Sequence, residues 1–289
     1  MPALPELPPI PAHYELELRP GVACARHRDW LQLLGDLGYG ADSEPNAQVS
    51  QLAGRRPLQE IVTPRGTLLL RRFTHGGLLR TFTGSRFRDP ARPFHELALA
   101  HELGRRGLGT PCVLGARARA VPGGGWRLDL LSLRVDGARD LESLLVARRS
   151  GGGRAADWHG LLRAAGEFVR RLHDAGLYHA DLTTKNLLIS SGDARPPAFH
   201  VLDLDRSLLR TALGPEDRQR NLQRLLRFVW RRDAAGPRAL SSTDYLAFLA
   251  GYESEPGKRR DLARAIHARH QRSLCWHRFG WGLERLFRG

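Results

Sequence analysis

The strongest constraint on this chain is a polar segment, residues 179–186 (HADLTTKN), set between apolar elements. A long stretch with apolar residues at helical spacing precedes it, and a short apolar strand, 186–189, follows directly. A second predicted strand, 199–204, brings Asp203 to its end and is closely followed by Asp205. Polar side chains gathered where apolar strands begin and end predict a site of chemistry at this place.

The residue types in this segment suit phosphoryl transfer. Such a site needs one carboxylate that orients the attacking hydroxyl, and an amide oxygen with a second carboxylate that hold Mg²⁺ against the phosphates. Asp181 and Asn186, on one tight loop, can face the same ion and substrate, and Asp203 can reach the same metal. The alternative is a chance coincidence of an HxD loop and a DxD strand, which explains neither the order nor the spacing.

The chain before this segment is typical of a small α+β layer. We expect a hairpin, a helix and a second hairpin around three glycines, with strands over 59–63 and 67–73, the helix over 92–106 and the second hairpin over 121–135. The first residues are rich in proline and poorly patterned apart from a short helical stretch that includes Leu31. We therefore expect an N-terminal extension over 1–47 and an N-lobe over 48–135.

Helices dominate the second half of the chain. Asp157 can cap a helix with a single apolar stripe, and further helices are expected over 216–233, 242–251 and 260–275. Together with the polar segment and its two strands, they form the expected C-lobe, 136–289.

Arginine supplies nearly all of a strong positive charge. Lys and Arg number 45 against 30 Asp and Glu, a formal balance of +15, and Lys185 and Lys258 are the only lysines. Such a chain attracts polyanions, whether nucleic acid, phosphorylated substrates or an anionic membrane face, although arginine-rich composition drift explains the same numbers. Since we find no recognised nucleic-acid-binding motif, we expect no nucleic-acid partner.

Cysteine usage and hydropathy restrict the compartment. Cys24, Cys112 and Cys275 stand far apart and outside any CxxC spacing, which disfavours a disulfide framework and a zinc site and fits a reducing cytosol. The longest aliphatic run, 68–70, is too short to span a bilayer, and the Pro-rich start lacks the pattern of a signal peptide.

The polar segment and the second strand resemble the catalytic core of the protein-kinase-like fold. Residues 179–186 are similar to the kinase catalytic loop, and residues 202–205 are similar to its metal-binding segment. The resemblance implies that Asp181 is the catalytic base and that Asn186 and Asp203 bind Mg²⁺. It also implies an α+β, two-lobe fold with a small β-rich N-lobe and a mainly helical C-lobe.

The upstream lobe can be interpreted through the same resemblance. Kinases pair a strand cation with a helix glutamate to hold the α- and β-phosphates of ATP. Glu96 is the candidate for the helix glutamate, and Arg71 occupies the position of the usual lysine. If the alignment with the kinase strand is shifted by one residue, Arg72 takes that position instead. A Gly-rich loop over the nucleotide should precede that strand. Gly54, in the segment 54–57, is the only candidate, and a simple β-turn is the alternative.

A finer resemblance is to the bacterial lipopolysaccharide core kinases, above all those that act on 3-deoxy-D-manno-octulosonic acid (Kdo). The matching segments are residues 70–78, 85–87, 92–97, 107–111, 179–182 and 202–206. The strand arginine in place of lysine, the Gly-Gly after it, the HAD triplet and the DxDR end are features of that family. Residues 183–185 depart from its pattern, in which small or amide residues are more usual.

This resemblance implies ATP-dependent phosphorylation of a Kdo hydroxyl on a lipid A precursor, at the cytoplasmic face of the bacterial inner membrane. Lys185 and Arg206 are candidate substrate contacts, because the acceptor carries carboxylates and phosphates. The C-terminal stretch 272–288 mixes aromatic residues with arginines, which suits the boundary of an anionic bilayer and a peripheral location. A terminal helix packed on the large lobe is the alternative for that stretch.

Three other functions remain open. Ala180 replaces the arginine of the usual HRD, and the segment between Asp205 and the next predicted helix, near Glu216, is short, so no phosphorylation-controlled loop is apparent. That disfavours a protein Ser/Thr kinase but leaves other small-molecule phosphotransferases of the same fold. The poor Gly-rich loop and the missing lysine favour a non-catalytic pseudokinase.

Overall fold

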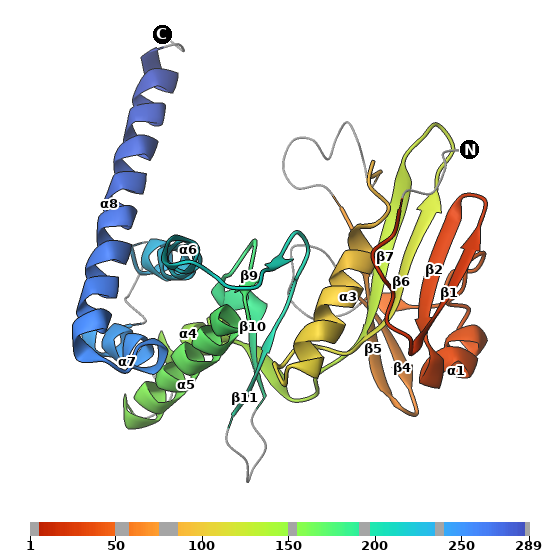
Figure 1. Cartoon of the computed structure of the whole chain (residues 1–289), viewed down its shortest axis with the longest axis horizontal. Coiled ribbons are helices and arrows are strands. Elements are labelled where there is room, and N and C mark those ends of the chain that lie inside the picture. Colours follow the sequence, from red (N-terminus) through yellow and green to blue (C-terminus); the bar gives the residue numbers. More distant parts are fainter. Residues whose placement is uncertain are drawn as a thin grey trace. The chain divides into compact units, whose positions relative to one another are not determined.

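The computed structural model describes residues 6–49, 58–74, 86–149, 155–190, 197–234 and 240–286. The chain divides into two compact units (Figure 1). Unit 1 comprises Met1–Asp136 with Leu204–Arg206, and unit 2 comprises Gly137–Asp203 with Ser207–Gly289.

Unit 1 is built on a seven-stranded antiparallel sheet with the strand order β1-β2-β6-β7-β5-β4-β3. Its strands are β1 (Tyr14–Arg19), β2 (Val22–His27), β3 (Gln48–Val49), β4 (Gln59–Thr63), β5 (Gly66–Arg72), β6 (Val113–Ala120) and β7 (Trp126–Leu133). The unit also contains η1 (Arg28–Trp30), α1 (Leu31–Asp36) and α3 (Arg92–Arg105). The predicted hairpin of β4 and β5, the short helix near Leu31 and the helix α3 are confirmed.

The sequence missed the first two strands. The stretch expected to be an extension, 1–47, supplies β1 and β2, and β2 pairs with β6 inside the sheet. The buried side chains of β2 are Ala23, Cys24 and Ala25, which are small and give little hydrophobic signal. The edge strand β1, YELELR, does alternate apolar and charged residues, but it lies between prolines, which led the sequence analysis to treat the region as poorly patterned.

The second predicted hairpin is correct at its turn and wrong at its first strand. Gly123, Gly124 and Gly125 all have positive φ and form the turn between β6 and β7. The first strand runs before Val121 rather than after it. Its sequence, VLGARARA, consists largely of small residues and arginines, so its apolar pattern is weak.

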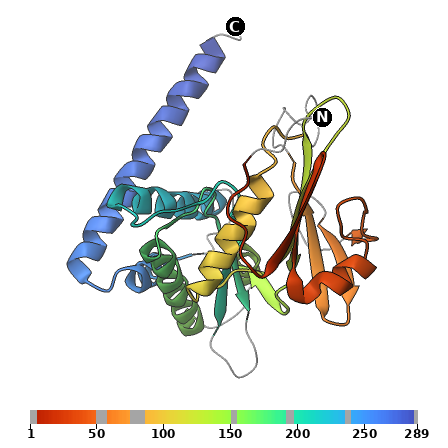
Figure 2. The same cartoon turned by 45° about the vertical axis from the view of Figure 1, so that its right-hand side comes forward.

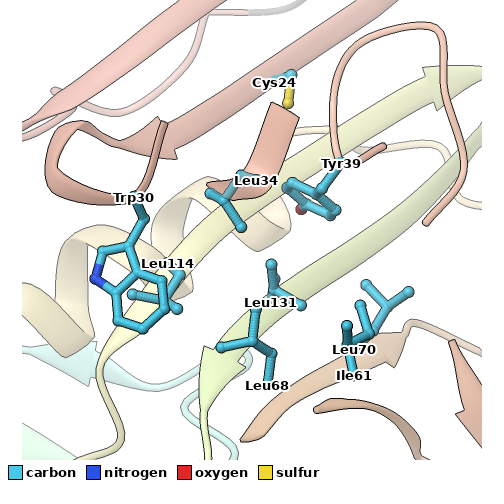
Figure 3. Close-up of a cluster of buried hydrophobic side chains, with 9 residues drawn as sticks. All are labelled: Cys24, Trp30, Leu34, Tyr39, Ile61, Leu68, Leu70, Leu114 and Leu131. Atoms are coloured by element: carbon cyan, nitrogen blue, oxygen red, sulfur yellow. The ribbon is translucent and has the colours of Figure 1, made fainter. Parts of the chain in front are cut away.

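One face of the sheet forms an apolar core, and Figure 3 shows its buried side chains. Leu68 and Leu70 of β5 pack there with Leu114 of β6 and Leu131 of β7, beneath Leu34 of α1. Burying each of these leucines contributes on the order of 1.5–3 kcal/mol. Side chains alternate along a strand, so Arg71, which follows Leu70, points toward the opposite face of the sheet. On that face α3 packs against β6 and β7.

A charged network is buried in the same unit. Arg117, which is fully buried, donates from Nε and Nη2 to Asp129 Oδ2 at 3.1 and 2.9 Å. The Tyr39 hydroxyl donates to Asp129 Oδ1 at 2.9 Å, and Arg117 Nη1 donates to the carbonyl oxygens of Gly40 and Ser43 at 2.8 and 2.6 Å. The network therefore fastens the segment after α1 onto the sheet.

Unit 2 is mainly helical, as expected. Its helices are α4 (Leu141–Arg149), α5 (Ala155–Asp174), η2 (Thr184–Asn186), α6 (Pro215–Ala234), α7 (Ser242–Tyr252) and α8 (Pro256–Leu286). Its strands are β8 (Ala138–Asp140), β9 (Leu177–Tyr178), β10 (Leu187–Ser190), β11 (Ala198–Val201) and β12 (Leu208–Leu209), in the orders β11-β10-β8 and β12-β9. Among the described residues, no helix combines the length and apolar character that crossing a bilayer requires.

The longest predicted helices of unit 2 are confirmed, and α8 extends beyond its expected end. The helices α5 and α7 cross at a pair of glycines. A Cβ on Gly166 would lie 2.1 Å from the Phe248 carbonyl oxygen, and a Cβ on Gly251 would lie 1.9 Å from that of Arg163. Only glycine permits two helix backbones to approach this closely. This crossing fixes the middle of α5, and from the C-terminal end of that helix the chain continues through β9 into the polar segment (Figure 2).

Candidate active site

The catalytic segment, residues 179–186, runs from β9 to the end of η2 and is held by a buried histidine. His179 Nε2 donates to the Leu202 carbonyl oxygen at 2.8 Å, and its Nδ1 accepts the Asp181 N–H at 3.0 Å. Burial lowers the pKa of His179, so the ring is neutral with its proton on Nε2. His179 is thus a brace between the segment and the end of β11.

Asn186 ties the two ends of the segment together. Its Nδ2 donates to the Asp181 carbonyl oxygen at 2.8 Å, and its backbone carbonyl accepts the Leu202 N–H at 2.9 Å. The side-chain amide nitrogen is therefore directed into the loop. No described residue donates to Oδ1, which leaves this oxygen available as a ligand.

Asp203 lies just beyond β11 with an exposed side chain and a left-handed backbone, φ +56°. A residue with a Cβ pays about 1–2 kcal/mol for this conformation, and such strain concentrates at functional sites. The pairing of Leu187 with Val201 sets Asn186 beside Leu202. Both Asp181 and Asp203 act electrostatically on His179. The structure therefore brings Asp181, Asn186 and Asp203 to the same end of the β10–β11 hairpin.

Helix α6 supplies two residues that the sequence analysis did not single out. Buried Asn221 accepts the His179 N–H at 3.0 Å and donates to the His179 carbonyl oxygen at 3.1 Å. Arg224 Nη1 donates to the Ala180 carbonyl oxygen and lies 3.4 Å from Asp181 Oδ1. The sequence did hold a signal for Asn221. It lies four residues before buried Leu225, so it is a polar residue on the apolar stripe of a helix.

In unit 1, Arg71 and Glu96 form an ion pair between β5 and α3. Glu96 is buried, and the Arg71 guanidinium also lies over the Phe73 ring, 4.6 Å from its centroid. Arg72 points away and pairs with Glu44 at 3.2 Å. Because neighbouring strand residues face opposite sides of the sheet, only Arg71 shares a side with α3.

A second ion pair of unit 1 involves the end of the metal-binding-like segment. Arg92, which begins α3, binds Asp205 through both Nε, at 3.1 Å, and Nη2. The guanidinium also lies 4.8 Å from the centroid of Phe87. This bidentate pair holds Leu204–Arg206 within unit 1 and gives Asp205 a role distinct from that of Asp203.

The remaining predicted site residues are the two candidate substrate contacts, Lys185 and Arg206, and the glycine expected above the nucleotide, Gly54. Lys185 is exposed, and its Nζ lies 3.8 Å from Glu142 Oε1. Arg206 is exposed and has a left-handed backbone, φ +61°. Gly54 lies outside the described residues.

No group of three or more His, Cys, Asp and Glu side chains within the described ranges could enclose a metal ion. That finding does not bear on Mg²⁺ in phosphoryl transfer, because this ion takes one or two protein oxygens and completes its shell with water and phosphate. The side-chain oxygens of Asn186 and Asp203 are of the chemical type that Mg²⁺ accepts as ligands.

Comparisons with known proteins identify the family to which this chain belongs. The sequence profile described as the lipopolysaccharide kinase (Kdo/WaaP) family matches residues 42–252. A 3-deoxy-D-manno-octulosonic acid kinase of Xanthomonas axonopodis pv. citri is 32% identical over 210 residues, which cover 71% of this chain and 78% of that protein. The enzyme of the same name from Stenotrophomonas maltophilia is 30% identical over 222 residues, covering 74% and 81%.

A solved structure, described as WaaP in complex with acyl carrier protein, is similar in fold. It is 18% identical and superimposes with a TM-score of 0.56 over 85% of this chain and 91% of its own. The predicted kinase-like fold is confirmed by this match. Since the family profile spans most of the sequence, including the catalytic segment and both ion pairs, the chain belongs to the lipopolysaccharide kinase (Kdo/WaaP) family.

Proposed function

We propose that this protein transfers the γ-phosphoryl group of ATP to a Kdo hydroxyl of a lipid A precursor in lipopolysaccharide core synthesis. Membership in a kinase family implies ATP as the donor, and the relatives cited above carry the name of the Kdo kinases. The single observation that carries the proposal is the convergence of Asp181, Asn186 and Asp203 at one end of the β10–β11 hairpin.

Asp181 is the proposed catalytic base. Its carboxylate accepts a hydrogen bond from the acceptor hydroxyl and takes the proton as that oxygen forms a bond to the γ-phosphorus. The bond between the γ-phosphorus and the bridging oxygen of ADP breaks, and ADP leaves with the electron pair. The backbone N–H of Asp181 is held by neutral His179, so the loop can present the carboxylate in a constant orientation.

Asn186 and Asp203 would hold Mg²⁺. The donor set fits, because an amide oxygen and a carboxylate are hard oxygen ligands, and the Nδ2 hydrogen bond to Asp181 turns Asn186 Oδ1 outward. When bound, the ion would neutralise charge on the phosphates. The exposed position of Asp203 leaves its carboxylate accessible to a nucleotide-bound ion.

Arg71 and Glu96 are proposed to bind the α- and β-phosphates of ATP. Glu96 is buried and fixes one side of the Arg71 guanidinium, while the arginine side chain is itself about one-third exposed. Arginine retains its charge at all physiological pH values and offers several donors to phosphate oxygens. It can therefore take the place of the usual lysine.

The proposed location is peripheral, on the cytoplasmic face of the inner membrane. The formal charge of +15 favours an anionic lipid surface as well as a phosphorylated acceptor. A glycolipid acceptor resides in that membrane, so the enzyme must work at its surface.

Transfer from labelled ATP tests the proposal. Purified protein should label a Kdo-bearing lipid A precursor in the presence of Mg²⁺, and Asp203→Asn should lose most of that activity. Label in general protein substrates alone would instead identify a protein kinase. Nucleotide binding without transfer to any acceptor, unchanged by Asp181→Ala, would identify a pseudokinase.

A further inference from the structure

Arg224 of α6 places a cation directly beside the proposed catalytic base. One nitrogen, Nη1, donates to the Ala180 carbonyl oxygen and lies 3.4 Å from Asp181 Oδ1. The acceptor hydroxyl must approach that same carboxylate. A substituent of the acceptor that lies on the Arg224 side of its reacting hydroxyl can therefore reach the guanidinium.

The rest of the guanidinium is available to a ligand. Arg224 Nε and Nη2 make no hydrogen bond to any residue that the structure describes, and the side chain is 39% exposed. An arginine presents its donors as a planar fork that matches a carboxylate bidentately. Nη1 thus anchors the side chain to the loop, while the opposite edge of the fork stays free for a carboxylate.

Other cations of unit 2 near the catalytic segment are engaged elsewhere. Lys185 Nζ lies 3.8 Å from Glu142. Arg210 pairs with Asp217, and Arg218 pairs with Asp174 at 2.6 Å. Of these cations, only Arg224 has a contact to Asp181 in the part of the chain that the structure describes.

We infer that Arg224 recognises the carboxylate of the acceptor sugar and thereby selects a keto-acid sugar over a neutral one. The inference rests on the proposed function, because Kdo carries this carboxylate on the same sugar as its hydroxyl groups. Arg224 would be a specificity-determining residue that touches the substrate. Its hydrogen bond to the Ala180 carbonyl oxygen holds the guanidinium beside Asp181.

The test combines a variant with a modified acceptor. Steady-state kinetics are measured with a Kdo-bearing lipid A precursor and with the methyl ester of its Kdo carboxylates, for wild type, Arg224→Gln and Arg224→Lys. Arg224→Gln retains a hydrogen-bond donor for Ala180 but removes the charge. The matched control is Arg220→Gln, one turn earlier on α6, whose partners are Glu216 and Asp217.

We expect Arg224→Gln to raise the KM for the acid acceptor about 10- to 100-fold, the loss of one charge-assisted interaction, while the KM for ATP stays unchanged. For wild type, the KM for the ester should exceed the KM for the acid by a similar factor. For Arg224→Gln, the KM for the ester should differ from that of wild type by less than about twofold. Arg224→Lys should recover part of the affinity for the acid, and Arg220→Gln should match wild type.

Two results would overturn the inference alone. One is wild-type enzyme that uses acid and ester with equal KM, a comparison that depends on no variant. The other is an Arg224→Gln enzyme whose kcat falls equally on both acceptors with KM unchanged, which would limit Arg224 to positioning Asp181. If wild type phosphorylates neither acceptor, the proposed function fails and the inference fails with it.

Discussion

The sheet of unit 1 and the catalytic segment of unit 2 are held together by different chemistry. Beside its apolar core, the sheet carries full charges in its interior, since Arg117 and Asp129 are buried together and Arg71 is paired with buried Glu96. The buried contacts of the catalytic segment are made by neutral groups, since His179 and Asn221 both bind backbone atoms, while the charged Arg224 contacts the segment from a partly exposed position. Buried charges make a unit sensitive to the loss of either partner, whereas neutral braces fix geometry at a smaller cost.

Removal of the proposed base should have the largest effect and separate activity from stability. Asp181→Asn should lower kcat about 10²- to 10⁴-fold because the acceptor proton loses its destination. Asp181 is tied to His179 and Asn186 through its backbone N–H and carbonyl oxygen, and its carboxylate is 43% exposed with one contact, to Arg224. The free energy of unfolding should therefore change by only about 0.5 kcal/mol. Kinetics and urea unfolding measure the two quantities. A large loss of stability would show that Asp181 is structural.

Breaking the buried charge pair of unit 1 should be the largest stability effect. Arg117→Met leaves Asp129 buried without its cation and should lower the free energy of unfolding by about 3–5 kcal/mol. Urea unfolding measures it. The double variant Arg117→Met with Asp129→Leu should recover much of the loss, because no charge then remains uncompensated. A single variant as stable as wild type would contradict the contrast drawn between the two regions.

Loss of the neutral brace should cost less. Asn221→Ala leaves the buried N–H and carbonyl of His179 unpaired and should lower the free energy of unfolding by about 1–3 kcal/mol. It should also reduce kcat, because His179 holds the Asp181 backbone. Gln219→Ala, on the same helix, is the control and should behave as wild type in both assays. Unchanged kcat in Asn221→Ala would remove the brace from the mechanism.

Acidification should weaken unit 2 through His173 of α5. Burial, with the charge of Arg218 nearby, lowers the pKa of His173 from its ordinary 6.5 to about 3. The unfolded state therefore binds the proton first, so stability is complete above pH 6.5 and falls as the pH drops toward 3. The loss from this group should approach about 1.4 kcal/mol per pH unit within that window.

Urea unfolding of wild type and His173→Gln between pH 7 and 4.5 checks this sign. The variant should lose part of the pH slope, whereas His267→Gln, at an exposed histidine, should retain it. Parallel slopes in wild type and His173→Gln would assign the acid sensitivity to other groups.

Local pattern was sufficient for much of the fold and for naming the candidate site residues. The hairpin of β4 and β5, the helix α3 and the long helices of unit 2 follow from turn residues and apolar spacing, which act over a few residues. The prediction of the catalytic segment is equally local, because it rests on the order of its polar residues. The small buried residues of β2 and the arginine-rich β6 left no such pattern, so their strands escaped detection.

Only the tertiary structure decided which partner each of the many arginines binds. The linear order of residues indicated which side chains are candidates for phosphoryl transfer, since loop composition and strand position depend on local sequence. It could not distinguish Arg71 from Arg72 in pairing with Glu96, nor associate Arg92 with Asp205 or Arg224 with Asp181. Such contacts join residues far apart along the chain, and they form only when packing of the surrounding sheet and helices brings the two charges together.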